Sequence, residues 1–115
     1  MTIDMYGIPN CDTIQKARRW LKSQDIAYTF HDYKKEGISM EALHAWCAQV
    51  GWEALLNKRS TTWRQLSDTD KSDLNQAKAI DLLMQHTSMI KRPVLLIDEK
   101  VIVGFSDSAY LDLFQ

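Results

Sequence analysis

The sequence predicts an α/β fold in which a four-stranded mixed sheet is interrupted by a helical insertion. Residues 1–32 alternate short apolar strands with an amphipathic helix, residues from about 36 to 90 show mainly helical periodicity, and residues 92–114 return to strand, turn and helix. No repeat or linker divides the 115 residues, so we expect a single domain, residues 1–115, with its helical insert at about 36–90.

The first 32 residues predict a βαβ unit. Apolar alternation marks a strand at residues 3–6, and residues 7–10 are typical of a loop. From about residue 12 to 24 the apolar side chains recur at helical spacing and form one stripe: Ile14, Ala17, Trp20 and Leu21. Residues 27–32 predict a second strand, so we expect a parallel pair with a right-handed crossover.

The middle of the chain predicts helices. Ser39 is a candidate N-cap and Gly51 a candidate C-terminal stop for one amphipathic helix, which a short helical turn at residues 52–56 follows. Residues 58–62 predict a polar loop, and residues 63–66 predict a turn. A later helix carries its apolar face at Ala77, Ile80, Leu83 and Met84.

The last part of the chain predicts a β-hairpin and a helix. Two apolar runs at residues 94–97 and 101–103 flank a polar turn. Ser106 is a candidate cap for a final helix, whose predicted packing face is Tyr110, Leu111, Leu113 and Phe114. The complete order, βαβ, helical insert, then ββα, predicts a thioredoxin-like fold.

Composition excludes several classes of protein. Fourteen basic and fifteen acidic side chains give a formal charge of -1, which argues against a nucleic-acid binder because such binding depends on excess Lys and Arg. No apolar run approaches the ~20 residues of a membrane span, and the first residues do not resemble a signal peptide. We therefore expect a cytoplasmic protein that binds neither nucleic acid nor membrane. No metal, flavin or nucleotide motif is present, so we expect no bound cofactor.

Cys11 is the candidate for chemistry because it lies between the first strand and the first helix. A helix N-terminus presents unsatisfied N–H groups and a partial positive charge, which stabilise a thiolate and can hold an oxyanion or a carboxylate. Asn10, Asp12 and Thr13 belong to the same junction and are candidate binding residues. The alternative is that Cys11 is a small residue that only packs in a tight turn.

Two arginines are candidate anion partners. Arg92 precedes Pro93 at the start of a predicted strand, where a proline is tolerated and where its bond could be cis. Arg59 lies in the polar loop. Either arginine could instead form a surface salt bridge.

Cys47 is interpreted differently from Cys11. It lies among Leu43, Trp46 and Val50 at helical spacing, which favours a small core residue. A role as a resolving thiol is the alternative.

Three segments carry a resemblance to a known family. Tyr6–Thr13 (YGIPNCDT), Leu55–Arg59 (LLNKR) and Ile90–Pro93 (IKRP, followed by VLLI) resemble the arsenate reductase (ArsC)/Spx family, in particular its short YffB-type branch. The resemblance covers essentially the whole chain. It implies a thioredoxin-like fold with a helical insert.

The resemblance also implies roles for individual residues. Cys11 would be the redox nucleophile, and Arg92 and Pro93 would flank the active site with the proline cis. Arg59 would take the role of the arginine in the insert, with Asn57 as the competing match in another register. In glutathione-linked arsenate reductases, one cysteine attacks the oxyanion, arginines hold it, and glutathione with glutaredoxin completes the cycle.

The chain departs from this pattern in three places. The arsenate reductases carry a histidine where this chain has Gly7 and Ile8, and a third arginine where it has Gly104–Ser106. Fewer charge-assisted donors should weaken the binding of arsenate. Spx-type regulators often have CxxC at this site, whereas Ile14 stands here in place of the second cysteine.

The leading hypothesis is therefore a glutathione-dependent thiol oxidoreductase, expected to be a monomer. Cys11 would form a mixed disulfide with a small thiol or disulfide substrate, and glutathione, with or without glutaredoxin, would release the product. The expected substrate or glutathione-binding residues are Asn10, Asp12, Thr13, Arg59, Arg92 and Pro93. The alternatives are an arsenate reductase and, in another class, a regulatory module that binds RNA polymerase.

Overall fold

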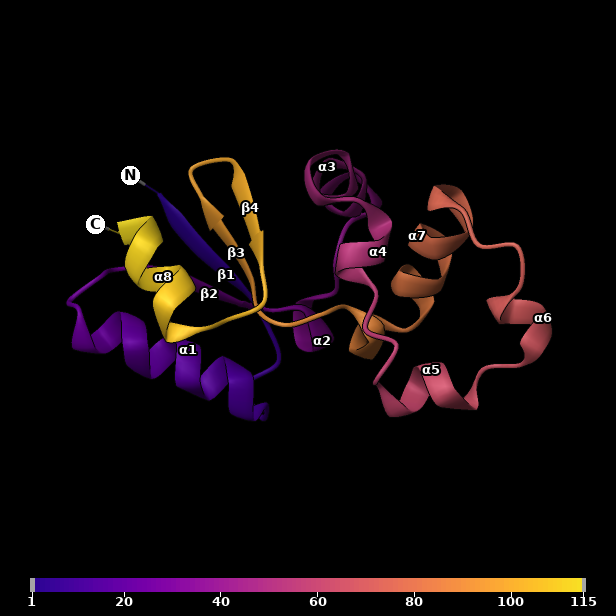
Figure 1. The fold of residues 1–115 in the computed structure, drawn as a ribbon, viewed down its shortest axis with the longest axis horizontal. Coiled ribbons are helices and arrows are strands. Elements are labelled where there is room, and N and C mark those ends of the chain that lie inside the picture. Colours follow the sequence, from indigo (N-terminus) through magenta and orange to yellow (C-terminus); the bar gives the residue numbers. More distant parts are fainter. Residues whose placement is uncertain (1, 115) are drawn as a thin grey trace. The chain divides into compact units, whose positions relative to one another are not determined.

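The computed structural model describes residues 2–114 and divides into two compact units. Among the described residues, the first combines residues 2–36 with residues 92–114, and the second is the continuous segment 37–91. Figure 1 shows the helices and strands of both units, coloured along the chain. No helix among the described residues is both long enough and apolar enough to cross a membrane.

Within the described residues, the first unit forms a four-stranded mixed sheet with the order β2-β1-β3-β4. β1 (Ile3–Gly7) pairs in parallel with β2 (Thr29–Asp32), and α1 (Asp12–Ser23) connects the two strands. β3 (Val94–Ile97) pairs antiparallel with β1 and with β4 (Lys100–Val103). The predicted fold class is confirmed. β2 starts at Thr29 rather than at residue 27, because its ladder with β1 begins there.

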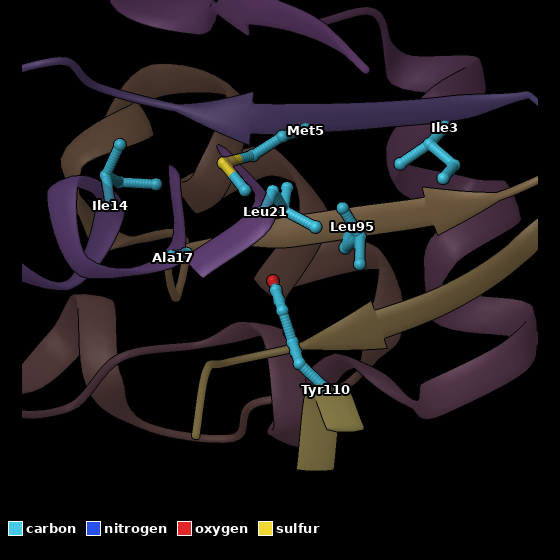
Figure 2. Close-up of a cluster of buried hydrophobic side chains, with 7 residues drawn as sticks. All are labelled: Ile3, Met5, Ile14, Ala17, Leu21, Leu95 and Tyr110. Carbon is cyan, nitrogen blue, oxygen red and sulfur yellow. The ribbon is translucent and has the colours of Figure 1, made fainter. Parts of the chain in front are cut away.

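One face of the sheet packs against α1 and α8 (Asp107–Phe114), which lie on the same side of it (Figure 1). Alternate residues of β1 are buried on this face, as the period of a half-buried strand requires. Figure 2 shows the resulting cluster, which consists of Ile3, Met5, Ile14, Ala17, Leu21, Leu95 and Tyr110. Removal of this apolar surface from water is the main favourable contribution to the stability of the unit.

α8 begins as the sequence predicts but packs through fewer side chains. Ser106 caps it, since its hydroxyl oxygen accepts a hydrogen bond from the backbone N–H of Ala109 at 3.1 Å. Tyr110 is buried, and Leu113 and Phe114 pack against the core cluster. Leu111 is 46% exposed, so its prediction as a packing residue is wrong. It follows Tyr110 by one position, and successive helix residues point about 100° apart.

The second unit is helical. Its elements are α3 (Met40–Val50), α4 (Trp52–Leu55), α5 (Thr61–Gln65), α6 (Asp68–Lys71), α7 (Gln76–Gln85) and the 3₁₀ helix η1 (Thr87–Met89). Ser39 caps α3 by accepting the N–H of Ala42 at 3.1 Å, and Gly51 ends it with φ +84°, a value that favours glycine. Both assignments confirm the prediction.

Three differences concern short helices. α5 starts inside the predicted polar loop, because the Ser60 hydroxyl accepts the N–H of Trp63 at 3.2 Å and caps a helix there. The sequence did not predict α2 (Tyr33–Glu36), which belongs to the first unit, or α6. Each spans four residues, too few to show an apolar period. Their signal is instead the capping residue before them, Asp32 for α2 and Ser67 for α6.

Candidate functional site

The strand register brings three chain segments to one end of the sheet. Gly7, the last residue of β1, is paired with Asp32, the last residue of β2. Tyr6 is paired with Val94, the first residue of β3. The loop after β1, the start of α2 and the segment before β3 therefore meet at the carboxyl end of the parallel strands. Open α/β sheets usually bind their ligands at this end.

Cys11 occupies the N-cap position of α1. Its backbone is extended (φ −129°, ψ 128°), and its carbonyl oxygen accepts the N–H of Gln15 at 2.9 Å. The thiol makes no capping hydrogen bond with any described residue, and the side chain is half-buried against the core cluster. The first-turn N–H groups and the helix dipole therefore favour the binding of an anion here.

Arg92 and Pro93 form the segment before β3, and the peptide bond between them is cis. Pro93 is buried, and its carbonyl oxygen accepts the N–H of Gly104 at 2.9 Å. Arg92 is half-buried. The backbone thus fixes a cationic side chain at the start of β3, at the sheet end that carries Cys11.

Tyr33 is the residue at this end that the sequence did not single out. It is 1% exposed, and the Arg92 side chain hydrogen-bonds to its hydroxyl. Burial raises the pKa of Tyr33 well above its ordinary value of 10.0, the Arg92 charge opposes that rise, and the negative charge of Cys11 adds to it. Tyr33 therefore lies within electrostatic reach of both Cys11 and Arg92. Its available signal was its place directly after the second strand of a βαβ unit.

Gly7 lets α1 approach the sheet closely beside this loop. A methyl group at Gly7 would overlap Cδ1 of Ile14 and lie 3.0 Å from its Cγ1. The arsenate reductases have a histidine in the segment where this chain has Gly7 and Ile8. A side chain at position 7 would therefore require the Ile14 side chain to move.

The other predicted site residues differ in position. Asn10 and Asp12 are exposed and Thr13 is half-buried, all around the Cys11 junction. Arg59 lies in the second unit, is exposed, and its backbone N–H donates to Oδ1 of Asn57 at 3.0 Å. Its participation in the anion site stays a prediction.

Cys47 is 4% exposed on α3, beside the buried Leu43 and Trp46. Burial raises the pKa of the Cys47 thiol, which keeps it protonated at neutral pH. A shielded, protonated thiol behaves as a core side chain and not as a nucleophile. Within residues 2–114, no three His, Cys, Asp or Glu side chains group as a metal site requires.

Comparison with known proteins agrees with this geometry. Residues 6–113 match the model of the ArsC family. The solved structure of a protein named YffB is 48% identical, covers 99% of this chain and 100% of its own, and superposes with a TM-score of 0.95. An arsenate reductase (ArsC) related protein from Brucella melitensis is 47% identical over 100% of this chain and 96% of its own, with a TM-score of 0.80. An uncharacterized protein of Haemophilus influenzae is 41% identical over 97% of this chain and 98% of its own length.

Proposed function

The chain belongs to the ArsC family, and on that premise we propose that it is a glutathione-dependent thiol oxidoreductase with Cys11 as its nucleophile. One observation carries the proposal. Cys11 is a half-exposed thiol at the N-cap of α1, at the sheet end where Arg92 precedes β3. The second cysteine is buried within another unit.

The proposed reaction proceeds through two exchanges. The Cys11 thiolate attacks one sulfur of a glutathione mixed disulfide, a protein–glutathione disulfide forms, and the other thiol leaves and takes a proton from water. A second glutathione thiolate then attacks that disulfide, which releases oxidised glutathione and restores the Cys11 thiolate. In total, one reduced glutathione is consumed and one molecule of oxidised glutathione is formed for each mixed disulfide reduced.

Two features support these steps. The partial positive charge at the N-terminus of α1 favours the thiolate form that attacks and the thiolate that leaves in the second exchange. Arg92 supplies a cation that can bind a carboxylate of glutathione through two parallel hydrogen bonds. The first-turn N–H groups of α1 add donors for the same negative charge.

The direct test is turnover of a glutathione mixed disulfide with reduced glutathione, followed as the formation of oxidised glutathione. We expect turnover by the native protein and by Cys47→Ala, and loss of turnover to background in Cys11→Ser, because the serine hydroxyl does not attack a disulfide. Mass spectrometry of the acid-trapped protein should find one added glutathione on the peptide that contains Cys11. Full turnover by Cys11→Ser would overturn the proposal.

The second candidate is an arsenate reductase, which the similarity to the Brucella protein favours. Replacing the mixed disulfide with arsenate in the same assay separates the two. Arsenate-dependent oxidation of glutathione with Cys11 required would establish the second activity. If neither substrate turns over and a stable complex with RNA polymerase is captured, the regulatory hypothesis holds instead.

A further inference from the structure

We propose that Tyr33 is a positioning residue for the Cys11 chemistry: its buried hydroxyl holds the Arg92 guanidinium ready to receive the negative group of a reactant. The inference rests on the proposed function of Cys11 and adds a residue to it. Neither the motifs around Cys11 nor those around Arg92 include Tyr33.

The backbone determines the position of Tyr33 in the fold. Its predecessor Asp32 is the last residue of β2 and is paired with Gly7, the last residue of β1. The Asp32 carboxylate accepts the N–H groups of Lys34 at 3.0 Å and Lys35 at 3.2 Å. These bonds cap α2 and hold the first helical turn, which starts with Tyr33, against the carboxyl end of the sheet.

The side chains of Tyr33 and Arg92 then meet at that end. A guanidinium has donors only, so the Tyr33 oxygen accepts the hydrogen bond from Arg92. Tyr33 is 1% exposed, whereas Arg92 is half-buried and reaches solvent. The fixed member of the pair is therefore the tyrosine, and the arginine is the member that a reactant can contact.

A neutral acceptor suits this role better than a carboxylate would. Burial raises the pKa of Tyr33, so the phenol stays uncharged at neutral pH. Arg92 is thus oriented without a counter-charge that would compete with the reactant's carboxylate. Ordering a long side chain before binding removes part of the entropic loss that binding would otherwise include.

The experiment measures how Cys11 discriminates between two alkylating reagents, negatively charged iodoacetate and neutral iodoacetamide. The rate ratio cancels the fraction of thiolate, so it reports the local positive field and not the acidity of the thiol. Peptide mass spectrometry separates labelling of Cys11 from that of Cys47. The variants are Tyr33→Phe, Arg92→Gln, both together, and Tyr110→Phe as the matched control at a second buried tyrosine.

We expect Tyr33→Phe to lower the iodoacetate-to-iodoacetamide ratio by about 2- to 10-fold, the range that corresponds to one net hydrogen bond. Arg92→Gln should lower the ratio at least as much, and adding Tyr33→Phe to Arg92→Gln should change it no further. Tyr110→Phe should leave it unchanged. An unchanged ratio in Tyr33→Phe, or an equal effect of Tyr33→Phe with and without Arg92, would overturn the proposal.

A measurement on the native protein covers the case in which Tyr33→Phe does not fold. Nitrogen-15 relaxation of the arginine Nε–Hε groups should find Arg92 rigid and the exposed Arg19 of α1 mobile. An Arg92 side chain as mobile as Arg19 would overturn the positioning role. If Cys11 reacts with neither reagent faster than free cysteine, the proposed function fails instead, and the relaxation data still decide the role of Tyr33.

Discussion

Two buried tyrosines lie in two regions of the first unit and differ in whether the hydroxyl group has a hydrogen-bond partner. Tyr33, at the carboxyl end of β2, is 1% exposed, and its hydroxyl oxygen accepts a hydrogen bond from the Arg92 side chain. Tyr110, on α8, is 0% exposed, and its hydroxyl finds no hydrogen-bond partner among the described residues. Figure 2 shows that hydroxyl directed into the core cluster.

The difference distinguishes a tyrosine that packs in the core from a tyrosine at the candidate site. The ring of Tyr110 lies edge-on to Trp20 and Phe105, at centroid distances of 5.6 and 4.6 Å. Tyr110 therefore contributes to stability through the apolar contacts of its ring, and its hydroxyl adds no hydrogen bond to a described residue. At the sheet end, the Tyr33 hydroxyl is hydrogen-bonded by the Arg92 side chain and lies within electrostatic reach of Cys11. A buried hydroxyl is therefore informative about function through its partner and not through its burial.

Gly7 is paired with Asp32, the residue before Tyr33, and approaches Ile14 of the core cluster, and a side chain there should produce the largest effect on stability. Gly7→Ala forces its methyl group into Ile14, and such overpacking destabilises by about 1–3 kcal/mol. Urea unfolding measures the change. Combining Gly7→Ala with Ile14→Val removes the overlapping Cδ1 and should recover part of the loss. Equal destabilisation with and without Ile14→Val would contradict the steric explanation.

Unfolding at alkaline pH tests the raised pKa that the two buried tyrosines share. Burial raises the pKa of each above its ordinary value of 10.0, so above pH 10 unfolding releases protons that the folded state retains. The contribution of each tyrosine to the free energy of unfolding is therefore fully present below pH 10. Above pH 10 the free energy of unfolding falls by about 1.4 kcal/mol per pH unit for each tyrosine. Urea unfolding between pH 9 and 11 should give a shallower fall in Tyr33→Phe and in Tyr110→Phe. A slope unchanged by both substitutions would refute the explanation.

At neutral pH the same two substitutions should differ in sign, although the effects are smaller. Tyr110→Phe removes an unpartnered polar atom, so we expect it to be neutral or to stabilise by up to about 1 kcal/mol. Tyr33→Phe removes a hydrogen bond and should destabilise by about 1 kcal/mol. Thermal unfolding of both variants checks this. Destabilisation by Tyr110→Phe would indicate a partner for that hydroxyl.

The sequence predicts those parts of the fold whose signal is local. The stripe of α1, the capping serines before α3 and α8, and the alternation of β1 each lie within one short window. Leu111 was misplaced because its type suits the core face while its angle on the helix does not. α2 and α6 were not predicted, because a helix of one turn is shorter than the apolar period that identifies a helix.

The candidate site was predictable only in part, for a related reason. Cys11 could be singled out because a strand-to-helix junction is visible along the chain, and Arg92 because Pro93 follows it. Tyr33 could not, because its importance depends on the register that pairs the end of β2 with the end of β1. That pairing is a property of the sheet, so the only sequence signal for Tyr33 is its place directly after the second strand of the predicted βαβ unit.

The interruption of the first unit by the second affects how the protein is made. On the ribosome, residues 37–91 emerge as a continuous segment, whereas β1 must wait for β3 because the two are separated by the whole second unit. Such long-range pairing closes late in folding. A nascent chain therefore exposes Cys11 before Arg92 has been synthesised, so the thiol is accessible before its site has been assembled.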